Sequence, residues 1–186
     1  MVTPDQVIKL VFSPSDIATA KRNAGKASLG GVSRVREGED RQYALAIDQL
    51  VGQLGQIAGH RWLYGHPFDY ARGRWYINRH PHVGDGGSDV ACGNIDFKAS
   101  LLRYPDKPLL DYHLLVRPAE RHKNLVYIPI IVDLQEDNTQ GCAYVMGWAT
   151  DEMLPESAEK EGVFQGAFAL CCADIHPLPP FKWNWT

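Results

Sequence analysis

The chain has 186 residues, 45% of them hydrophobic, which is enough to bury a core in one domain. Its formal net charge is −3 at pH 7, so the overall balance gives no support to a nucleic-acid partner, although a local basic path would be compatible with one. No apolar run approaches the roughly 18–20 residues of a membrane-spanning helix, and the first residues show no signal-peptide pattern. We therefore expect a cytoplasmic protein with no membrane partner.

Two helices are predicted in the first third of the chain. Residues 4–27 have a helical character, which Pro14 interrupts, and either Ser13 or Ser15 can cap the helix that follows. Residues 34–59 carry apolar side chains at spacings of three and four, which predicts a long helix.

Glycines within the second helix indicate how it packs. Gly52 and Gly55 are poor helix formers, but their small size allows another backbone to come close. We therefore expect this helix to pack tightly on a sheet. Residues 60–87 are rich in Gly, Pro, His and Arg and predict loops, with one short strand near Trp75–Asn78.

The remainder of the chain predicts a run of strands, at Ser88–Cys92, Asn94–Ser100, Tyr112–Val116, Leu125–Leu134 and Cys142–Trp148. Gly93 lies between the first two and indicates a hairpin. The stretch Leu125–Leu134 is the most apolar and rich in β-branched residues, which predicts a buried central strand. Pro129 within it indicates a bulge or an edge position.

The last third of the chain predicts short elements. Residues 151–161 favour a short acidic helix or turn, residues 164–172 a strand or helix, and the Pro- and Trp-rich tail from residue 176 a path across the surface. We expect a single α/β domain over residues 1–186, with a mixed sheet flanked by helices. Its core spans about residues 34–155, and the N-terminal helix and the tail pack on it.

Four cysteines are present, and none belongs to a CxxC pair. Cys171 and Cys172 are adjacent, which is poor geometry for a disulfide between them. We therefore expect free thiols in a reducing compartment for these two and for Cys92 and Cys142.

Acidic and basic residues gather in the stretch GDGGSDVACGNIDFKAS. Asp96 and Lys98 are two residues apart on a predicted strand, so both side chains point to one face and Phe97 to the other. Asp89, on the preceding strand of the hairpin, would bring a second carboxylate to them. Carboxylate oxygens suit Mg²⁺ or Mn²⁺, and a nearby lysine can stabilise negative charge on phosphorus. An ordinary surface salt bridge gives the same pattern, so the residues alone leave both roles open.

This stretch resembles the core motif of PD-(D/E)XK nucleases, restriction-endonuclease-like enzymes that include resolvases and phage or mobile-element nucleases. The similar residues are Gly87, Asp89 and Val90, followed by Ile95-Asp96-Phe97-Lys98-Ala99-Ser100. The resemblance covers about residues 45–155 and implies a restriction-endonuclease-like fold. It also implies Asp89 and Asp96 as ligands of Mg²⁺ or Mn²⁺, Lys98 as the catalytic lysine and DNA as the substrate.

One residue departs from the family pattern. The segment GQLGQIAGHRWLYG resembles the helix that precedes the family's core motif, in which a glutamate often joins the metal, but this chain has Gln56 there. A neutral amide can offer one oxygen to a cation or orient a water, and it attracts a cation more weakly than a carboxylate does. Under the resemblance this departure leaves three options open: an active variant, a metal site completed from elsewhere, or a degraded nuclease that only binds.

Further residues are candidates for supporting roles. Asp85 is either an additional carboxylate near the metal or a turn residue in GDGG. Ser100 shares the strand face of Lys98, where it can contact a water or a phosphate or serve as an ordinary strand hydroxyl. The group Arg72, Arg74 and Arg79 can contact nucleic-acid phosphates, or belong to a loop that packs its own aromatic residues.

Histidines offer a different metal hypothesis, because His60, His66, His80 and His82 fall within a short stretch. No cysteine lies at zinc-finger spacing and there is no HExxH pattern, so zinc is disfavoured.

Two function classes follow from these patterns. The first is a metal-dependent DNA endonuclease that uses Asp89, Asp96 and Lys98, with Gln56 positioning the attacking water. The alternative is a catalytically altered nucleic-acid-binding or assembly module on the same fold, and a homodimer is left open for either. A small-molecule enzyme has no Gly-rich phosphate loop or nucleophile motif in its favour.

Overall fold

The structure is a computed structural model that describes residues 1–27, 41–65, 94–160, 162 and 164–179, with the side chains of 26, 27 and 41–45 excepted. Several expectations fall outside these residues: the loop near residue 30, the strand near residue 76 and the first strand of the hairpin at 88–92. Within the described residues the chain has an α/β architecture, as the sequence predicts.

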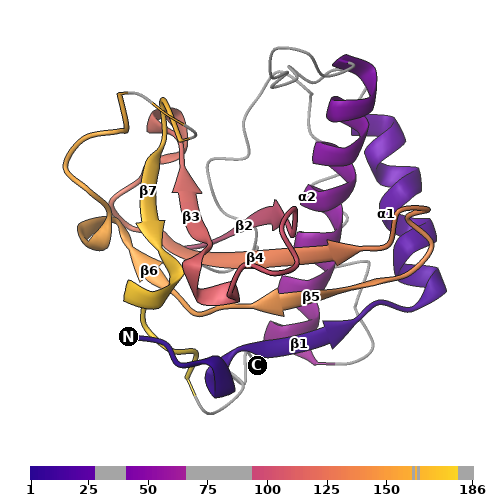
Figure 1. The fold of residues 1–186 in the computed structure, drawn as a ribbon, viewed down its shortest axis with the longest axis horizontal. Coiled ribbons are helices and arrows are strands. Elements are labelled where there is room, and N and C mark those ends of the chain that lie inside the picture. The colour runs from indigo at the N-terminus through magenta and orange to yellow at the C-terminus, as the bar shows by residue number, and fades with distance from the viewer. Residues whose placement is uncertain (28–40, 66–93, 161, 163, 180–186) are drawn as a thin grey trace.

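Two α-helices and seven strands make up the described fold (Figure 1). The helices are α1 (Pro14–Ala27) and α2 (Arg41–Tyr64). The strands are β1 (Ile8–Val11), β2 (Ile95–Leu101), β3 (His113–Val116), β4 (Val126–Leu134), β5 (Gly141–Val145), β6 (Ala149–Thr150) and β7 (Phe168–Cys171). Short 3-10 helices include η3 (Pro118–Glu120) and η4 (Asp151–Met153).

The larger sheet is mixed and has the order β1-β5-β4-β2, with β6 pairing to β4 beyond the end of β5. Strands β2 and β4 run parallel, and the other pairs of this sheet are antiparallel. A separate antiparallel pair joins β3 and β7. Both helices cover one face of the larger sheet, and the β3–β7 pair lies against the opposite side (Figure 1).

Two apolar cores result from this arrangement, one on each face of the sheet. Side chains alternate along β4, so Ile128 and Ile130 pack in the core under the helices. Tyr127 and Ile131 point the other way, into the core shared with β3 and β7. The long apolar run of β4 is therefore explained by burial on both faces, as predicted for a central strand.

Close packing joins α2 to β2, as the glycines of the helix predict. A Cβ added at Gly55 would lie 2.4 Å from Cβ of Ala99, and one at Gly59 would lie 2.6 Å from the ring of Phe97. The expectation is confirmed for Gly55, but it is wrong for Gly52, where a Cβ would meet open space.

The N-terminal segment is not one helix. Residues Ile8–Val11 form β1, which pairs antiparallel with β5, and the helix begins only at Pro14. Ser13 caps it, because the Asp16 amide donates to Oγ of Ser13 at 3.1 Å and the Ser13 amide donates to Oδ2 of Asp16 at 2.8 Å. The predicted break and cap are thus confirmed, while the helical prediction before them is wrong.

Helix α2 extends beyond its predicted end at residue 59. It continues through Tyr64, and Gly65 follows it with a positive φ of 81°, a backbone conformation that glycine adopts without strain. The residues His60 to Tyr64 therefore belong to the helix rather than to the predicted loop region.

Pro129 lies in a central strand at a local bulge. Between the pairs Ile130–Val145 and Tyr127–Ala149, two residues of β4 face three residues of the chain that joins β5 to β6. The Pro129 carbonyl accepts a hydrogen bond from the Met146 amide at 3.1 Å. The Pro129 nitrogen points to the same side, where the ladder is interrupted and a missing hydrogen is tolerated. The predicted bulge is confirmed.

The remaining elements agree with the sequence in type more than in length. Strand β3 matches its prediction, whereas the fifth predicted strand ends at Val145 and resumes as β6. The acidic segment starts with η4, and residues 168–171 form β7. His176 is exposed, but Leu178 packs in the core under the helices, so the tail does not lie wholly on the surface as expected.

Two further observations concern the described residues. Cys142, Cys171 and Cys172 are free, as predicted, and Cys92 lies outside the described part. Neither α1 nor α2 has the length and apolarity of a bilayer-crossing segment.

Candidate functional site

Asp96 and Lys98 lie on one face of β2, as the alternation of the strand predicts. Phe97 and Ala99 face α2, so Asp96 and Lys98 point to the opposite side of the sheet. The Lys98 ammonium lies 2.8 Å from Oδ2 of Asp96. Asp96 is buried, with 6% of its surface exposed, so this carboxylate is placed in a low-dielectric setting where its contact with a cation is strong.

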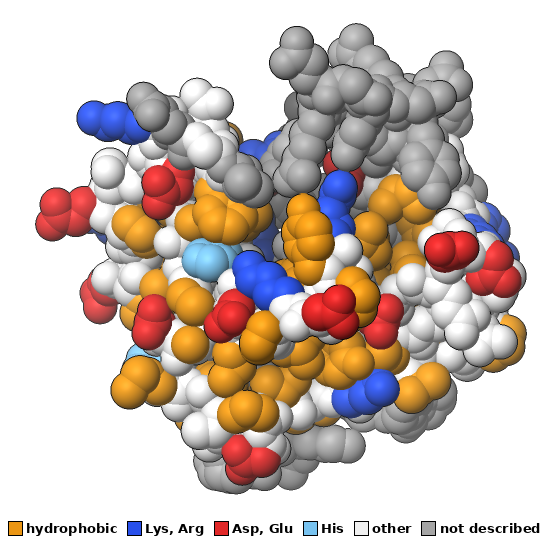
Figure 2. Space-filling model, viewed as in Figure 1, with side chains coloured by type: hydrophobic (Ala, Val, Ile, Leu, Met, Phe, Trp, Pro, Cys, Tyr) orange, Lys and Arg blue, Asp and Glu red, His pale blue; other side chains and the backbone are white. Residues whose placement is uncertain are grey.

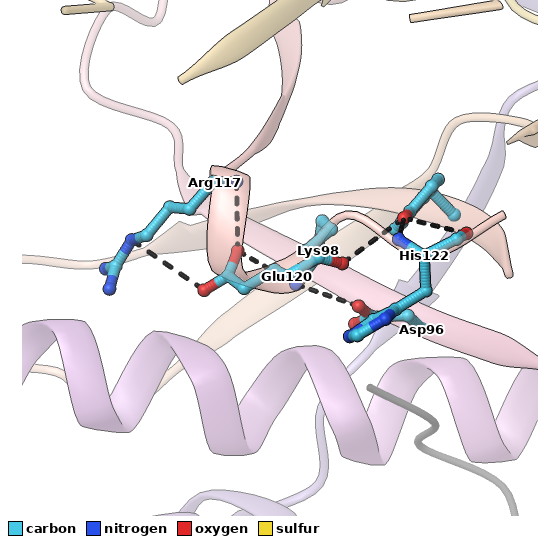
Figure 3. A network of polar contacts seen from close by, with 6 residues as sticks. Asp96, Lys98, Arg117, Glu120 and His122 are labelled. Atoms are coloured by element: carbon cyan, nitrogen blue, oxygen red, sulfur yellow. Dashed lines mark hydrogen bonds and ion pairs between the residues drawn. The ribbon is translucent and has the colours of Figure 1, made fainter. Parts of the chain in front are cut away.

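A second carboxylate reaches the same lysine from a different element. Glu120, at the end of η3 in the connection between β3 and β4, accepts from Lys98 Nζ through Oε2 at 3.1 Å. The same oxygen accepts from the Arg117 amide at 3.3 Å, and Oε1 lies 3.7 Å from Arg117 Nε (Figure 3). Lys98 is thus bonded to two acidic residues that are separated by 24 positions in the sequence.

Glu120 is a site residue that the sequence does not predict. Its signal there is a single acidic residue in the polar stretch RPAERHKN, without a motif or a spacing that links it to Lys98. Only the return of the chain through β3 to the parallel partner of β2 brings Glu120 to this face.

Tyr127 fixes the backbone that carries Glu120. Its ring is fully buried opposite Asp96 in the β2–β4 register. Its hydroxyl accepts from the His122 amide at 2.8 Å and donates to the Glu120 carbonyl at 3.2 Å. Asp96 is therefore positioned by its own strand, β2. Glu120 is positioned by the Tyr127 hydroxyl, which comes from the neighbouring strand β4. In Figure 3 the imidazole of His122 points to the side on which Asp96 lies.

Arg121, between Glu120 and His122, anchors the same connection through its side chain. Its guanidinium forms an ion pair with the Asp151 carboxylate, donates to the Pro155 carbonyl at 3.0 Å and lies over the ring of Phe168 at 4.3 Å. Several directed hydrogen bonds combined with a stacked ring suit the planar guanidinium better than a lysine ammonium. The connection is thereby held at Arg121 as well as at Tyr127.

The electrostatics of the site favour a charged lysine. Burial by itself would lower the pKa of Lys98, but the carboxylates of Asp96 and Glu120 outweigh it and hold this pKa above its ordinary value. The ammonium is therefore protonated at neutral pH and acts as a hydrogen-bond donor or a fixed positive charge, not as a base.

The structure brings together only some of the predicted site residues. Ser100 lies on the face of β2 that carries Lys98, and it is partly buried. Gln56 is partly buried on α2, which packs on the opposite face, so it could join Asp96 only around the edge of β2. The remaining predicted site residues, Asp85, Asp89, Arg72, Arg74 and Arg79, lie outside the described residues.

The histidines are only partly described. His60 is buried on α2, where its ring stacks on Tyr64 and meets the edge of Phe97. His66, His80 and His82 lie outside the described residues.

The described residues can hold one divalent cation that needs only a few protein ligands. Mg²⁺ is often held by one or two carboxylates, with waters and phosphate completing its shell, and Asp96 is a buried carboxylate of this kind. Across the described ranges no three His, Cys, Asp or Glu side chains converge as a complete metal site. A metal here would therefore rely on Asp96, with further ligands from the substrate, from water or from outside the described residues.

Comparisons of the chain with models of protein families, with curated proteins and with solved structures found no match.

Proposed function

We propose that this protein is a metal-dependent nuclease that hydrolyses DNA phosphodiester bonds, with a core of the PD-(D/E)XK type on a restriction-endonuclease-like fold. The observation that carries the proposal is the pair Asp96 and Lys98, which share one face of β2 with the ammonium 2.8 Å from the carboxylate. This is the strand geometry that the IDFKAS motif predicts.

The architecture around the pair is compatible with the proposed fold. The motif strand β2 lies parallel to the buried central strand β4, and α2 packs closely on β2 through Gly55 and Gly59. A nuclease of this type needs its acidic and basic groups fixed by rigid elements, because small displacements reduce catalysis. Here both groups come from one strand, β2, which pairs with the buried strand β4 and packs against α2.

Each residue has a proposed role. Asp96 holds the metal together with Asp89, and Mg²⁺ or Mn²⁺ bound there supplies a Lewis acid that polarises the phosphodiester. Lys98, charged at neutral pH, donates to the attacking water or to a phosphate oxygen and stabilises the negative charge that develops. Glu120 positions Lys98 through its 3.1 Å hydrogen bond. Gln56 is the proposed aid in orienting the water, which it would reach around the edge of β2, and Asp85 and Ser100 are proposed further contacts to water or phosphate.

The direct test is cleavage of a supercoiled plasmid in the presence of Mg²⁺ or Mn²⁺. We expect metal-dependent nicking by the wild type and a loss of at least about 100-fold in Asp96→Asn and in Lys98→Gln, since each removes a charge used in the reaction. Asp106→Asn and Lys160→Gln are matched controls, because both side chains are exposed. Cleavage that survives in both site variants would show that another site is responsible.

A second candidate function, a nucleic-acid-binding or assembly module without catalysis, is favoured by one observation. The Lys98 ammonium already contacts two carboxylates, as in a structural ion-pair network. Calorimetry with Mn²⁺ separates the two candidates. The nuclease proposal expects metal binding that is lost in Asp96→Asn and in Asp89→Asn, whereas the module binds no metal and still binds DNA with strong salt dependence.

A further inference from the structure

The connection between β3 and β4 carries several basic residues, and the structure divides them into two kinds. Arg121 is already engaged by the Asp151 carboxylate, the Pro155 carbonyl and the ring of Phe168. A guanidinium held in this way has its donors directed at protein groups. Arg121 is therefore assigned to the structure of the connection.

Arg117 and Lys123 differ from Arg121 in their surroundings. The Arg117 side chain is 45% exposed, and Lys123 and its neighbour His122 are exposed as well. The contact from Arg117 Nε to Glu120 is long, at 3.7 Å, and an exposed ion pair of this kind contributes little to stability. The guanidinium can thus turn to another anion at small cost, and its planar set of donors matches a phosphate group.

Glu120 connects this exposed arginine to the candidate catalytic lysine. One oxygen of its carboxylate accepts from Lys98, and the other faces Arg117 (Figure 3). The hydroxyl of Tyr127 fixes the backbone at Glu120 and at His122, the residue before Lys123. Arg117 therefore lies one carboxylate away from Lys98, and Lys123 follows in the same connection, directly after His122.

The rest of the visible surface has no single dominant charge. On the face drawn in Figure 2, acidic and basic side chains are interspersed, in keeping with the net charge of −3. Attraction of a polyanion to this protein must then come from local groups of cations. The connection next to the site is one such group among the described residues.

We propose that Arg117 and Lys123 contact backbone phosphates of duplex DNA next to the bond that is cut. This inference rests on the proposed nuclease function, which supplies the identity of the partner. Phosphate contacts hold the duplex in place and carry no sequence information, so they are expected to act equally on all sequences.

The test measures binding of a fluorescent duplex by anisotropy, in EDTA so that the DNA stays intact, over a series of KCl concentrations. Arg117→Gln/Lys123→Gln should bind unrelated duplexes more weakly and lower the magnitude of the log K against log[KCl] slope by about 2, close to one per lost phosphate contact. Lys21→Gln/Lys160→Gln is the matched control, since it removes two exposed lysines elsewhere and should keep the wild-type slope.

The outcomes separate this inference from the function on which it rests. A wild-type slope in the Arg117/Lys123 double variant, or no salt-dependent duplex binding by the wild type, overturns the inference. If the wild type still nicks plasmid with Mn²⁺ in that case, the nuclease proposal stands and the DNA follows another path. If the slope changes as expected but no metal supports cleavage, the phosphate contacts are supported and the nuclease proposal is wrong.

Discussion

The ammonium group of Lys98 donates to the carboxylate of Glu120 at 3.1 Å, which joins β2 to the connection between β3 and β4. The same ammonium contacts Asp96 on its own strand. Two segments that belong to different parts of the sequence are therefore coupled through one charge. The coupling makes this cluster a determinant of stability as well as a candidate site.

Removing the Lys98 ammonium alone should destabilise the fold more than removing the charges of Lys98 and Asp96 together. Lys98→Met takes the cation from the Asp96 carboxylate, which is buried, and we expect the free energy of unfolding to fall by about 3 kcal/mol. Asp96→Asn/Lys98→Met should recover part of this loss, because no buried charge is left behind. Urea denaturation of the wild type, both single variants and the double variant measures the coupling. Strict additivity of the two single effects would contradict it.

Helix α2 should tolerate an added methyl group at one glycine and not at another. In Gly55→Ala the new Cβ collides with Ala99, and overpacking of this kind costs about 1–3 kcal/mol. Gly52→Ala has the same chemistry, but its Cβ meets open space, so the better helix propensity of alanine should stabilise the protein by up to about 1 kcal/mol. Thermal unfolding of the two variants should therefore shift in opposite directions.

The start of α1 depends on one serine. Ser13→Ala removes the acceptor of the Asp16 amide and should lower the free energy of unfolding by about 1 kcal/mol. Ser15→Ala, two residues later and exposed, is the control and should be neutral within about 0.5 kcal/mol. Equal effects of the two substitutions in urea denaturation would argue against the cap.

The Cys172 thiol should make the fold sensitive to alkali. Burial raises the pKa of Cys172 from 9.0 to about 12. Because the folded pKa lies above the unfolded one, the stabilisation is complete below pH 9 and is lost as the pH rises toward 12. At pH 10.5 the loss amounts to about 2 kcal/mol. Urea midpoints measured from pH 8 to 10.5 should fall more steeply in the wild type than in Cys172→Ala, and parallel curves would disprove the link.

Much of the local structure could be predicted, because the signals for it lie within a few residues. Ser13 is followed by Pro14 and Asp16, which together specify a helix start. The alternation of β2 places Asp96 and Lys98 on one face whatever the rest of the fold does. The β-branched run of β4 likewise indicates burial on both sides.

Other features could not be predicted, since their causes lie far away in the sequence. Ile8–Val11 becomes a strand because β5 offers it an edge to pair with, and tertiary pairing then overrides the local helical pattern. Glu120 reaches Lys98 only after β3 and β4 have set the path of the chain between them. The α/β class therefore follows from the sequence, whereas the membership of the site depends on the topology.

The pairing of β1 with β5 has a consequence for synthesis on the ribosome. Lys9 lies opposite Tyr144, so β1 has its partner only after the residues between the two have been made. At about 5–20 residues per second this interval lasts roughly 7–27 s. Contacts so distant in sequence also slow folding in general. During that time Ile8 and Leu10 lack the strand that pairs with β1, so we expect β1 to be a binding segment for a nascent-chain chaperone.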